Sequence, residues 1–95
     1  SSVGYDTCAY IGFFLKDPSQ FDQVIEKLKT IPEVVECHIT TGQYDMFIKL
    51  FAKNNSDLMS IIHGKLQNLG LARTETLISF KEVFKRNIPV IDPEA

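Results

Sequence analysis

The sequence is poor in the residues that build metal centres and redox sites. It has two cysteines, Cys8 and Cys37, and two histidines, His38 and His63. These residues form neither a CxxC motif nor a cluster with metal-ligand spacing. Isolated thiols are typical of free cysteines in a reducing cytoplasm. We therefore expect no metal, no cofactor and no disulfide.

Long hydrophobic runs and an excess of basic charge are also missing. No apolar run approaches the roughly 18 residues of a membrane span, and no signal peptide opens the chain. The net charge of -2 and the pI of about 5.6 argue against a surface that grips a phosphate backbone. There is no P-loop and no GxGxxG motif. We expect a soluble, cytoplasmic protein that does not contact a membrane and does not itself bind DNA.

The composition is that of a folded domain. The chain has 95 residues, of which 44% are hydrophobic and 23% charged, so it has room for one domain and little tendency to disorder. We assign residues 1–95 to a single domain, with a core over 5–86 and a tail over 87–95.

Four β-rich runs alternate with two amphipathic ones. Strands are predicted over 5–15, 34–41, 44–52 and 74–85. The second and third strands form a hairpin through a short turn at Gly42 and Gln43.

Each predicted helix has its own start and stop signals. Asp17 is an N-cap candidate, Pro18 suits the first helical position, and Gln20 has the capping-box spacing. Pro32 ends this helix. For the second helix the N-cap candidates are Asn54, Asn55 and Ser56, and Gly70 is placed to end it. The apolar stripes are Phe21, Val24, Ile25, Leu28 and Ile31 in the first helix, and Leu58, Ile61, Ile62, Leu66 and Leu69 in the second.

The two halves of the chain resemble each other at an offset of 38 residues, which aligns Lys27 with Lys65 and Ile31 with Leu69. A repeated β-α-β unit joined by a hairpin is the ferredoxin-like βαββαβ pattern. We predict an α+β fold, with a four-stranded antiparallel sheet, the first and third strands at its centre, and two helices on one face.

The uncovered face of this sheet predicts self-association. The same offset puts Ile11 and Phe13 on one face with Phe47, Lys49 and Phe51, and Lys49 is unlikely beneath a helix. Fully burying Ile11, Phe13, Phe47 and Phe51 is worth roughly 6–12 kcal/mol in total, and monomers rarely leave such a patch exposed. We expect a dimeric α/β sandwich packed sheet to sheet. The alternative is a monomer whose tail, residues 88–91, folds over the sheet.

The turn over Thr40–Asp45 is the best candidate for a ligand site. It combines a flexible glycine, backbone N–H groups, hydroxyls and a carboxylate. Such N–H groups can bind a carboxylate and Asp45 can pair with an ammonium, the two handles of a free amino acid. The alternative is a plain hairpin turn in which Asp45 bonds its own backbone.

Two motifs resemble those of the Lrp/AsnC, or feast/famine, regulators. The run from Ile31 to Asp45, IPEVVECHITTGQYD, is close to the family pattern L-P-E-V-V-E-x-x-x-V/T-T-G-x-x-D. The run from Leu71 to Leu77, LARTETL, is similar to the entry into the last strand of that family's effector domain, G-V-x-R-T-x-T. The resemblance covers residues 3 to about 86.

The resemblance implies an effector-binding and oligomerisation domain. Such domains dimerise through their sheets, often assemble as tetramers of dimers, and bind amino acids between dimers. Carried over by motif, the effector-binding candidates are Thr41, Gly42, Gln43, Tyr44 and Asp45, joined by Thr74, Glu75 and Thr76 from a neighbouring subunit. Asp45 would bind the ammonium and the backbone around Gly42 the carboxylate, while Gln43 and Tyr44 would tune side-chain preference.

Family members normally carry an N-terminal helix-turn-helix domain, which these residues lack. DNA would be a partner only through that domain. The start at Ser1 and Ser2 favours a fragment over a natural stand-alone effector domain that modulates full-length relatives.

An enzyme on the same fold, such as a small isomerase or monooxygenase, is the alternative of a different class. It needs a His or an acid that points into an enclosed cavity, and His38 is the sole plausible candidate. We expect a regulatory domain rather than an enzyme.

Overall fold

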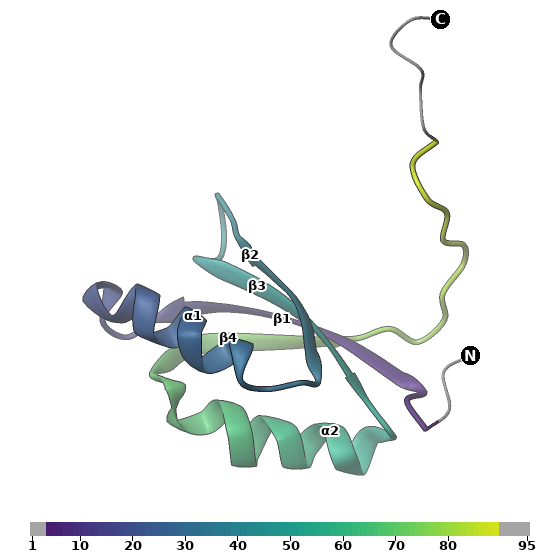
Figure 1. The fold of residues 1–95 in the computed structure, drawn as a ribbon, viewed down its shortest axis with the longest axis horizontal. Coiled ribbons are helices and arrows are strands. Elements are labelled where there is room, and N and C mark those ends of the chain that lie inside the picture. Colours follow the sequence, from purple (N-terminus) through teal and green to yellow (C-terminus); the bar gives the residue numbers. More distant parts are fainter. Residues whose placement is uncertain (1–3, 90–95) are drawn as a thin grey trace, which may run out of the picture.

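The computed structural model describes residues 4–89. Its main elements, in chain order, are β1 (Thr7–Leu15), α1 (Phe21–Lys29), β2 (Val34–Ile39), β3 (Met46–Ala52), α2 (Asn55–Ile61) and β4 (Leu71–Ile78). The strands form one antiparallel sheet in the order β2-β3-β1-β4, and α1 and α2 lie on the same side of it (Figure 1). The predicted ferredoxin-like α+β fold is confirmed, including the central position of β1 and β3.

The capping signals act where the sequence places them. The Asp17 carboxylate accepts a hydrogen bond from the Ser19 backbone N–H at 3.0 Å, ahead of a 3-10 turn over Pro18–Gln20 that leads into α1. The Asn54 side chain accepts one from the Asp57 N–H at 2.8 Å and starts α2. Side-chain caps of this kind satisfy N–H groups that the first helical turn leaves without partners.

The second helical segment is less regular than predicted. After α2 it continues as a π-helical turn over Ile62–Leu66 and a 3-10 turn over Gln67–Leu69. Gly64 lies within the π-helical turn, where the lack of a side chain weakens the preference for α-helix. Gly70 ends the segment with φ 76°, the left-handed conformation predicted for it.

Two predicted boundaries are wrong. The turn at Gly42 and Gln43 is a wider loop, because β2 ends at Ile39 and β3 begins at Met46. The last strand runs over Leu71–Ile78 instead of 74–85. It begins early because Leu71 pairs with Leu15, and its pairing with β1 ends at Ile78 opposite Ala9, followed by one last bond from the Ser79 N–H to the Cys8 carbonyl at 2.9 Å.

The facing prediction for β1 is also wrong. Ile11 and Phe13 are 1% and 0% exposed and belong to the core beneath the helices, with Leu28 and Leu58. Phe47 and Phe51 lie on the opposite, open face, as predicted, because the residues paired with them in β1 are Gly12 and Cys8. Ile11 and Phe13 are therefore not available to a sheet-to-sheet interface.

The error has a geometric cause. The 38-residue offset holds between the helices, but the last residues of β1 and β3, Leu15 and Ala52, are 37 positions apart (52 − 15). Successive residues of a strand point to opposite faces, so a change of one residue moves every side chain of the strand to the other face.

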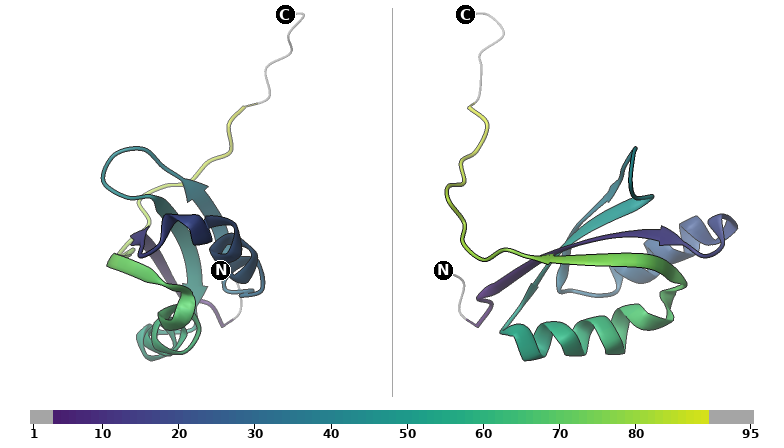
Figure 2. Two further views of the ribbon diagram at one scale, coloured as in Figure 1. Left: turned by 90° about the vertical axis from the view of Figure 1, so that its left-hand side faces the viewer. Right: turned by 180° about the vertical axis from the view of Figure 1, so that it is seen from behind.

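Residues 79–89 follow β4 without regular structure and lead away from the sheet (Figures 1 and 2). Ile88 is 90% exposed, so the described part of the tail does not cover the sheet as the monomer alternative requires. Val90 and Ile91, the rest of the segment in that alternative, lie outside the described residues.

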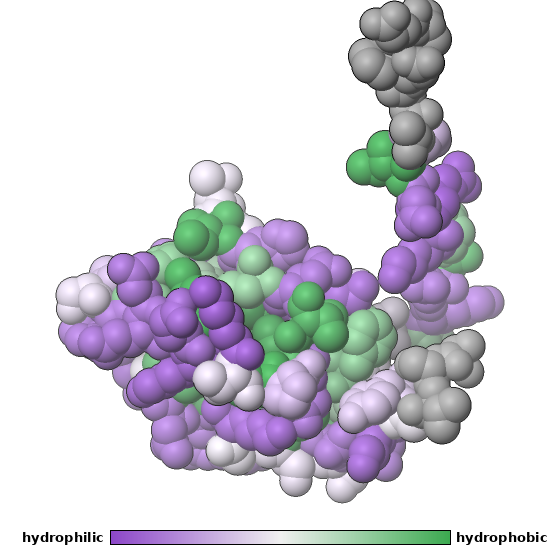
Figure 3. Space-filling model, viewed as in Figure 1, coloured by the Kyte–Doolittle hydropathy of each residue, from purple (hydrophilic) through white to green (hydrophobic). Residues whose placement is uncertain are grey.

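The helix side of the molecule is largely hydrophilic, with hydrophobic side chains gathered beside α1 and the outer strand β2 (Figure 3). Val35 and Ile39 of β2 are 50% and 69% exposed. Over residues 4–89, no helix has the length and apolar character to cross a membrane.

We predict that Phe13→Ala lowers the free energy of unfolding by about 3–5 kcal/mol, since it opens a cavity in the core. The neighbouring Phe14→Ala should cost about 1 kcal/mol, because Phe14 lies on the open face and loses mainly ring contacts. Urea unfolding followed by circular dichroism measures both. A loss for Phe14→Ala that exceeds the loss for Phe13→Ala would mean that the two faces are exchanged.

Candidate functional site

A row of neighbouring aromatic side chains lies on the open face of the sheet. We call Tyr10, Phe47, Tyr44 and Phe14 the aromatic row. The Tyr10 and Phe47 rings are nearly parallel with centroids 5.9 Å apart, Phe47 and Tyr44 are 6.4 Å apart, and Tyr44 and Phe14 are 6.1 Å apart. These distances are those of favourable aromatic pairs.

A cation lies at each end of the row. The Arg73 guanidinium lies 5.6 Å from the Phe14 ring centroid. The Lys49 ammonium lies 5.9 Å from the Tyr10 ring and 5.4 Å from the Phe51 ring, and 3.7 Å from a Glu36 carboxylate oxygen. Cations near aromatic faces at these distances gain about 0.5–1 kcal/mol at exposed sites. The aromatic row is therefore apolar along its length and has a cation at each end.

Gly12 makes room for the row. A Cβ placed on Gly12 would lie 2.6 to 2.8 Å from three ring atoms of Tyr44, closer than packed carbon atoms approach. Tyr44 belongs to the loop between β2 and β3, yet its ring lies flat on the central strand because position 12 has no side chain. This contact ties the loop to the open face.

Asp45 anchors the same loop by its backbone and its side chain. Its N–H donates to the Phe13 carbonyl at 3.0 Å, and its own carbonyl accepts from the Thr40 N–H at 3.2 Å. The half-buried carboxylate accepts from the Leu15 N–H through Oδ2 at 3.2 Å. A carboxylate has about four acceptor positions, so Oδ1 can still take a charged donor.

The rest of the loop is exposed. Thr41, Gly42 and Gln43 are open to solvent, and Gly42 has φ 96°, a conformation that favours glycine. The Thr40 hydroxyl donates to the Tyr44 carbonyl at 2.9 Å and closes the loop at its base. The plain-turn alternative is wrong in one respect: the Asp45 side chain bonds the backbone of β1 and not that of its own turn.

The second motif lies on the outer strand β4, where its residues are divided between the two faces. Glu75 pairs with Gly12 on the open face. Thr74 and Thr76 lie on the helix side, in the wall of a cavity of about 330 Å³ between β4 and the segment after α2. Lys16, His63 and Gln67 give this cavity polar groups, and its floor is Ile11, Leu66 and Leu71.

The two motifs approach the same stretch of β1 from opposite sides. Asp45 bonds the backbone of Phe13 and Leu15, while Glu75 pairs with Gly12. Within one chain, however, the loop and the two threonines do not line one pocket. A site that uses all of them needs groups from a second chain, as the motif resemblance implies.

The open face also includes Tyr10, Phe14 and Arg73, which the sequence did not predict there. Arg73 has φ 51° and sits where the pairing of β1 with β4 shifts register, a bulge that redirects its side chain. The signal for the aromatic residues was Gly12, a glycine within a β-rich run, which often marks a close approach of another group.

Three titratable groups of the sheet, two near the open face and Cys37 on the helix side, have shifted pKa values. Burial, with a smaller effect of Cys8, raises the pKa of Tyr10, so its hydroxyl is a neutral hydrogen-bonding group at physiological pH. The hydrogen bond from His38 is the largest of the effects that lower the pKa of Glu36, whose carboxylate is therefore charged. Burial raises the pKa of the Cys37 thiol, which is accordingly a poor nucleophile.

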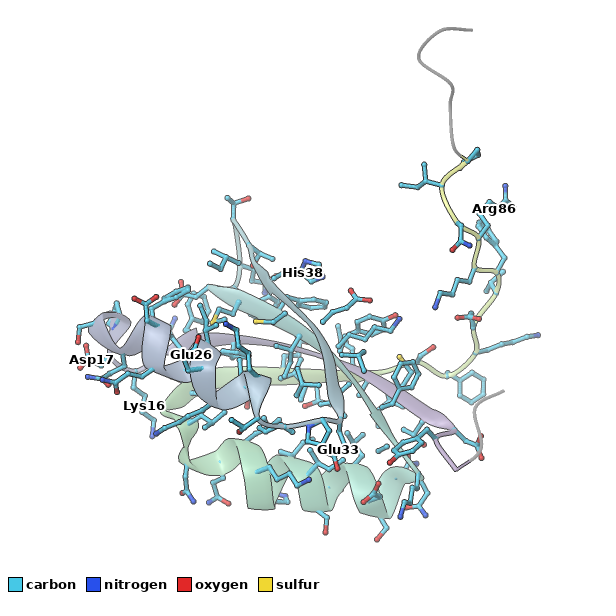
Figure 4. All side chains as sticks on the ribbon, viewed as in Figure 1. Lys16, Asp17, Glu26, Glu33, His38 and Arg86 are labelled. Carbon is cyan, nitrogen blue, oxygen red and sulfur yellow. The ribbon has the colours of Figure 1, made fainter. Side chains whose placement is uncertain are left out.

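His38 lacks the setting of a catalytic base. It lies exposed on the outer strand β2, paired with Glu36 at 2.9 Å (Figure 4). It lines none of the cavities described here. Within residues 4–89, no three His, Cys, Asp or Glu residues are grouped to hold a metal ion.

The fold and the site together define a small regulatory ligand-binding domain. Comparison with known proteins agrees. Residues 8–89 match the family model of the Lrp/AsnC ligand-binding domain. The regulatory protein AsnC of Haemophilus influenzae is 39% identical over 87 residues, which cover 90% of this chain and 58% of that protein.

Solved structures give the same result. The structure of Escherichia coli AsnC superposes with a TM-score of 0.85 at 33% identity, covering 90% of this chain and 58% of that one. A hypothetical protein from Pyrococcus horikoshii has a TM-score of 0.71 at 28% identity, with 82% of this chain and 94% of that one covered. A transcriptional regulator from Neisseria meningitidis, solved in complex with L-methionine, shares the fold with a TM-score of 0.83 at 19% identity, covering 92% of this chain and 58% of that one.

The chain belongs to the Lrp/AsnC ligand-binding domain family. It spans a little over half of the AsnC proteins it matches. Because these relatives are named as transcription regulators, membership speaks for a regulatory domain and against the enzyme alternative built on His38.

We predict that Gly12→Ala destabilises the domain by about 1–3 kcal/mol, because the new methyl group and the Tyr44 ring cannot occupy the same space. Tyr44→Ala should relieve the clash, so that the double variant costs less than the sum of the two single variants. Gly64→Ala is the matched control, since nothing lies within 4 Å of a Cβ at that position. Additive costs in the double-mutant cycle would mean that the ring does not lie on Gly12.

Proposed function

We propose that this chain is the amino-acid-sensing and oligomerisation domain of an Lrp/AsnC-type transcription regulator, acting in the cytoplasm. The observation that carries the proposal is the loop of Thr41–Asp45. One end of it is fixed to β1 by the Asp45 carboxylate, and the other end leaves exposed backbone N–H groups around Gly42.

This loop offers complementary groups to both ends of a free amino acid. The second carboxylate oxygen of Asp45 binds the ammonium, and N–H groups near Gly42 bind the carboxylate. Gln43 and Tyr44 adjust the preference for the effector side chain. That the meningococcal regulator, which shares this fold, was solved in complex with L-methionine supports an amino acid as the effector.

The effector site is completed between dimers. Thr74, Glu75 and Thr76 of a neighbouring subunit supply the remaining contacts, because these residues do not meet the loop within one chain. The cavity beside Thr74 and Thr76 provides room on the helix side of β4 for part of the ligand.

The open face forms the dimer interface. The interface residues that we propose are Tyr10, Phe14, Phe47 and Phe51. Ile11 and Phe13 are no longer included, because they are buried in the core. A contiguous aromatic patch of this kind is typical of an interface, and two copies related by a two-fold axis bury it on both sides at once. Four such dimers would form a ring.

Effector binding would then change assembly or geometry and thereby reposition DNA-binding domains outside these residues. The energy for this change comes from the difference in effector affinity between the two assembly states. A stand-alone sensor that forms mixed rings with full-length relatives is the second candidate, and the match to nearly the whole of the Pyrococcus horikoshii protein favours it.

We predict that Asp45→Asn weakens the binding of the effector amino acid by at least about tenfold, a loss of about 1.4 kcal/mol. Asparagine keeps an oxygen for the Leu15 N–H and loses the charge, so the fold stays intact while the ammonium loses its partner. Calorimetry across the standard amino acids, first with the native chain, identifies the effector and measures the change. Asp22→Asn, an exposed acid on α1, is the control; equal affinity in native and Asp45→Asn chains removes Asp45 from the site.

We predict a native chain that is at least dimeric at micromolar concentration, and a Phe47→Ser variant whose dimer dissociation constant is at least about tenfold higher. Sedimentation equilibrium measures both. Ile39→Ser is the matched control, because Ile39 is equally apolar and more exposed but lies on the helix side of the sheet. A monomeric native chain would contradict the proposed interface.

A further inference from the structure

The segment after β4 exposes several large apolar side chains to solvent. We call residues 79–89 the arm. Its large apolar side chains are almost fully exposed: Phe80 99%, Val83 84%, Phe84 72% and Ile88 90%. These hydrophobic residues are interspersed among hydrophilic ones along the arm (Figure 3). Apolar side chains gathered in one short segment mark a surface that another surface covers.

The spacing of these residues places the largest apolar side chains on one side of an extended arm. Phe80, Phe84 and Ile88 follow one another at intervals of four, and in an extended chain residues an even number apart point to the same side. From Phe80 to Ile88 an extended arm spans about 26 Å, at about 3.3 Å per residue. That length matches the eight-residue strand β4, so an arm can cross a sheet of this size from end to end.

The arm begins at the edge of the open face. The Ser79 backbone N–H donates a hydrogen bond to the Cys8 carbonyl near the start of β1. From there the arm forms one wall of a groove of about 690 Å³, whose other wall includes Tyr10, Lys49 and Phe51 of the open face. Beyond this groove the arm leaves the domain (Figure 2), and Arg86 stands well clear of the sheet (Figure 4).

We propose that the arm docks on a second copy of this chain, where Phe80 and Phe84 extend the interface formed by the open faces. The inference rests on the proposed dimer and adds a separate element to it. In a sheet-to-sheet dimer the partner covers the open face, so an arm that starts at the edge of that face runs directly onto the partner. Two-fold symmetry makes the contact reciprocal, since each copy gives one arm and receives one.

Charge favours the same occupant. The arm carries Lys81, Lys85 and Arg86 against Glu82, a net charge of +2. Residues 4–78 carry seven basic and nine acidic side chains, a net charge of -2. A basic arm is therefore attracted to an acidic body of this kind, and the body of a second copy is such a surface.

The chain contains no tryptophan, so one introduced tryptophan reports on the arm alone. In Phe84→Trp we expect a blue-shifted emission at concentrations where sedimentation finds dimers, and a shift to the red as dilution separates them. Lys85→Trp places the reporter on the other side of an extended arm and should emit further to the red in the dimer. As a second measurement, Phe80→Ser combined with Phe84→Ser should raise the dimer dissociation constant at least about tenfold, whereas Lys81→Ser with Lys85→Ser should change it far less.

Three results would overturn the arm proposal, and they separate it from the proposed dimer. Red emission of Phe84→Trp within an intact dimer means that the arm is free in solvent. Blue emission that does not depend on concentration means that the arm folds on its own sheet. A native chain that sediments as a monomer contradicts the dimer, and the arm proposal with it.

Discussion

The contact between the Tyr44 ring and the bare backbone of Gly12 is the constraint on which the open face depends. Any larger residue at position 12 would push the ring off the central strand. Without Tyr44 the aromatic row separates into Tyr10 with Phe47 on one side and Phe14 on the other, since Tyr44 is the ring that both Phe47 and Phe14 contact. A loop residue thus gives continuity to a surface that strands alone would leave interrupted.

Much of the fold could be predicted because its signals are local. The caps at Asp17 and Asn54 act within three residues of themselves, and Gly70 needs only its own left-handed conformation. The strand order followed from the repeat and from the handedness of crossover connections. Of the candidate site, the Thr41–Asp45 loop was predicted from its composition and stays a prediction, while the bond from the Leu15 N–H gives the Asp45 carboxylate a structural role.

What could not be predicted depends on partners distant in sequence. Ile11 and Phe13 were predicted on the wrong face because a shift of one residue reverses the face of every side chain in a strand. No local signal separates an offset of 37 residues between the two halves of the chain from one of 38. The end of β4 is set by where its pairing with β1 ends, at Ala9 and Ile78, and not by the β-rich run that continues through Phe80 and Val83. Arg73 reaches Phe14 only through a bulge in the pairing of β1 with β4.

In the proposed function, the loop places effector binding and dimer formation on neighbouring residues. Asp45 bonds β1 through its backbone and carboxylate, while the ring of Tyr44, one position earlier, lies in the middle of the open face. A ligand that shifts Asp45 must strain or move Tyr44, because the Thr40 bonds to both residues close the loop at its base. Coupling of this kind is reciprocal: if effector binding changes the stability of the proposed dimer, then dimer formation changes effector affinity by the same factor. A ligand site isolated from the aromatic row would lack this link, so the position of Tyr44 between the proposed effector site and the proposed interface would couple the two.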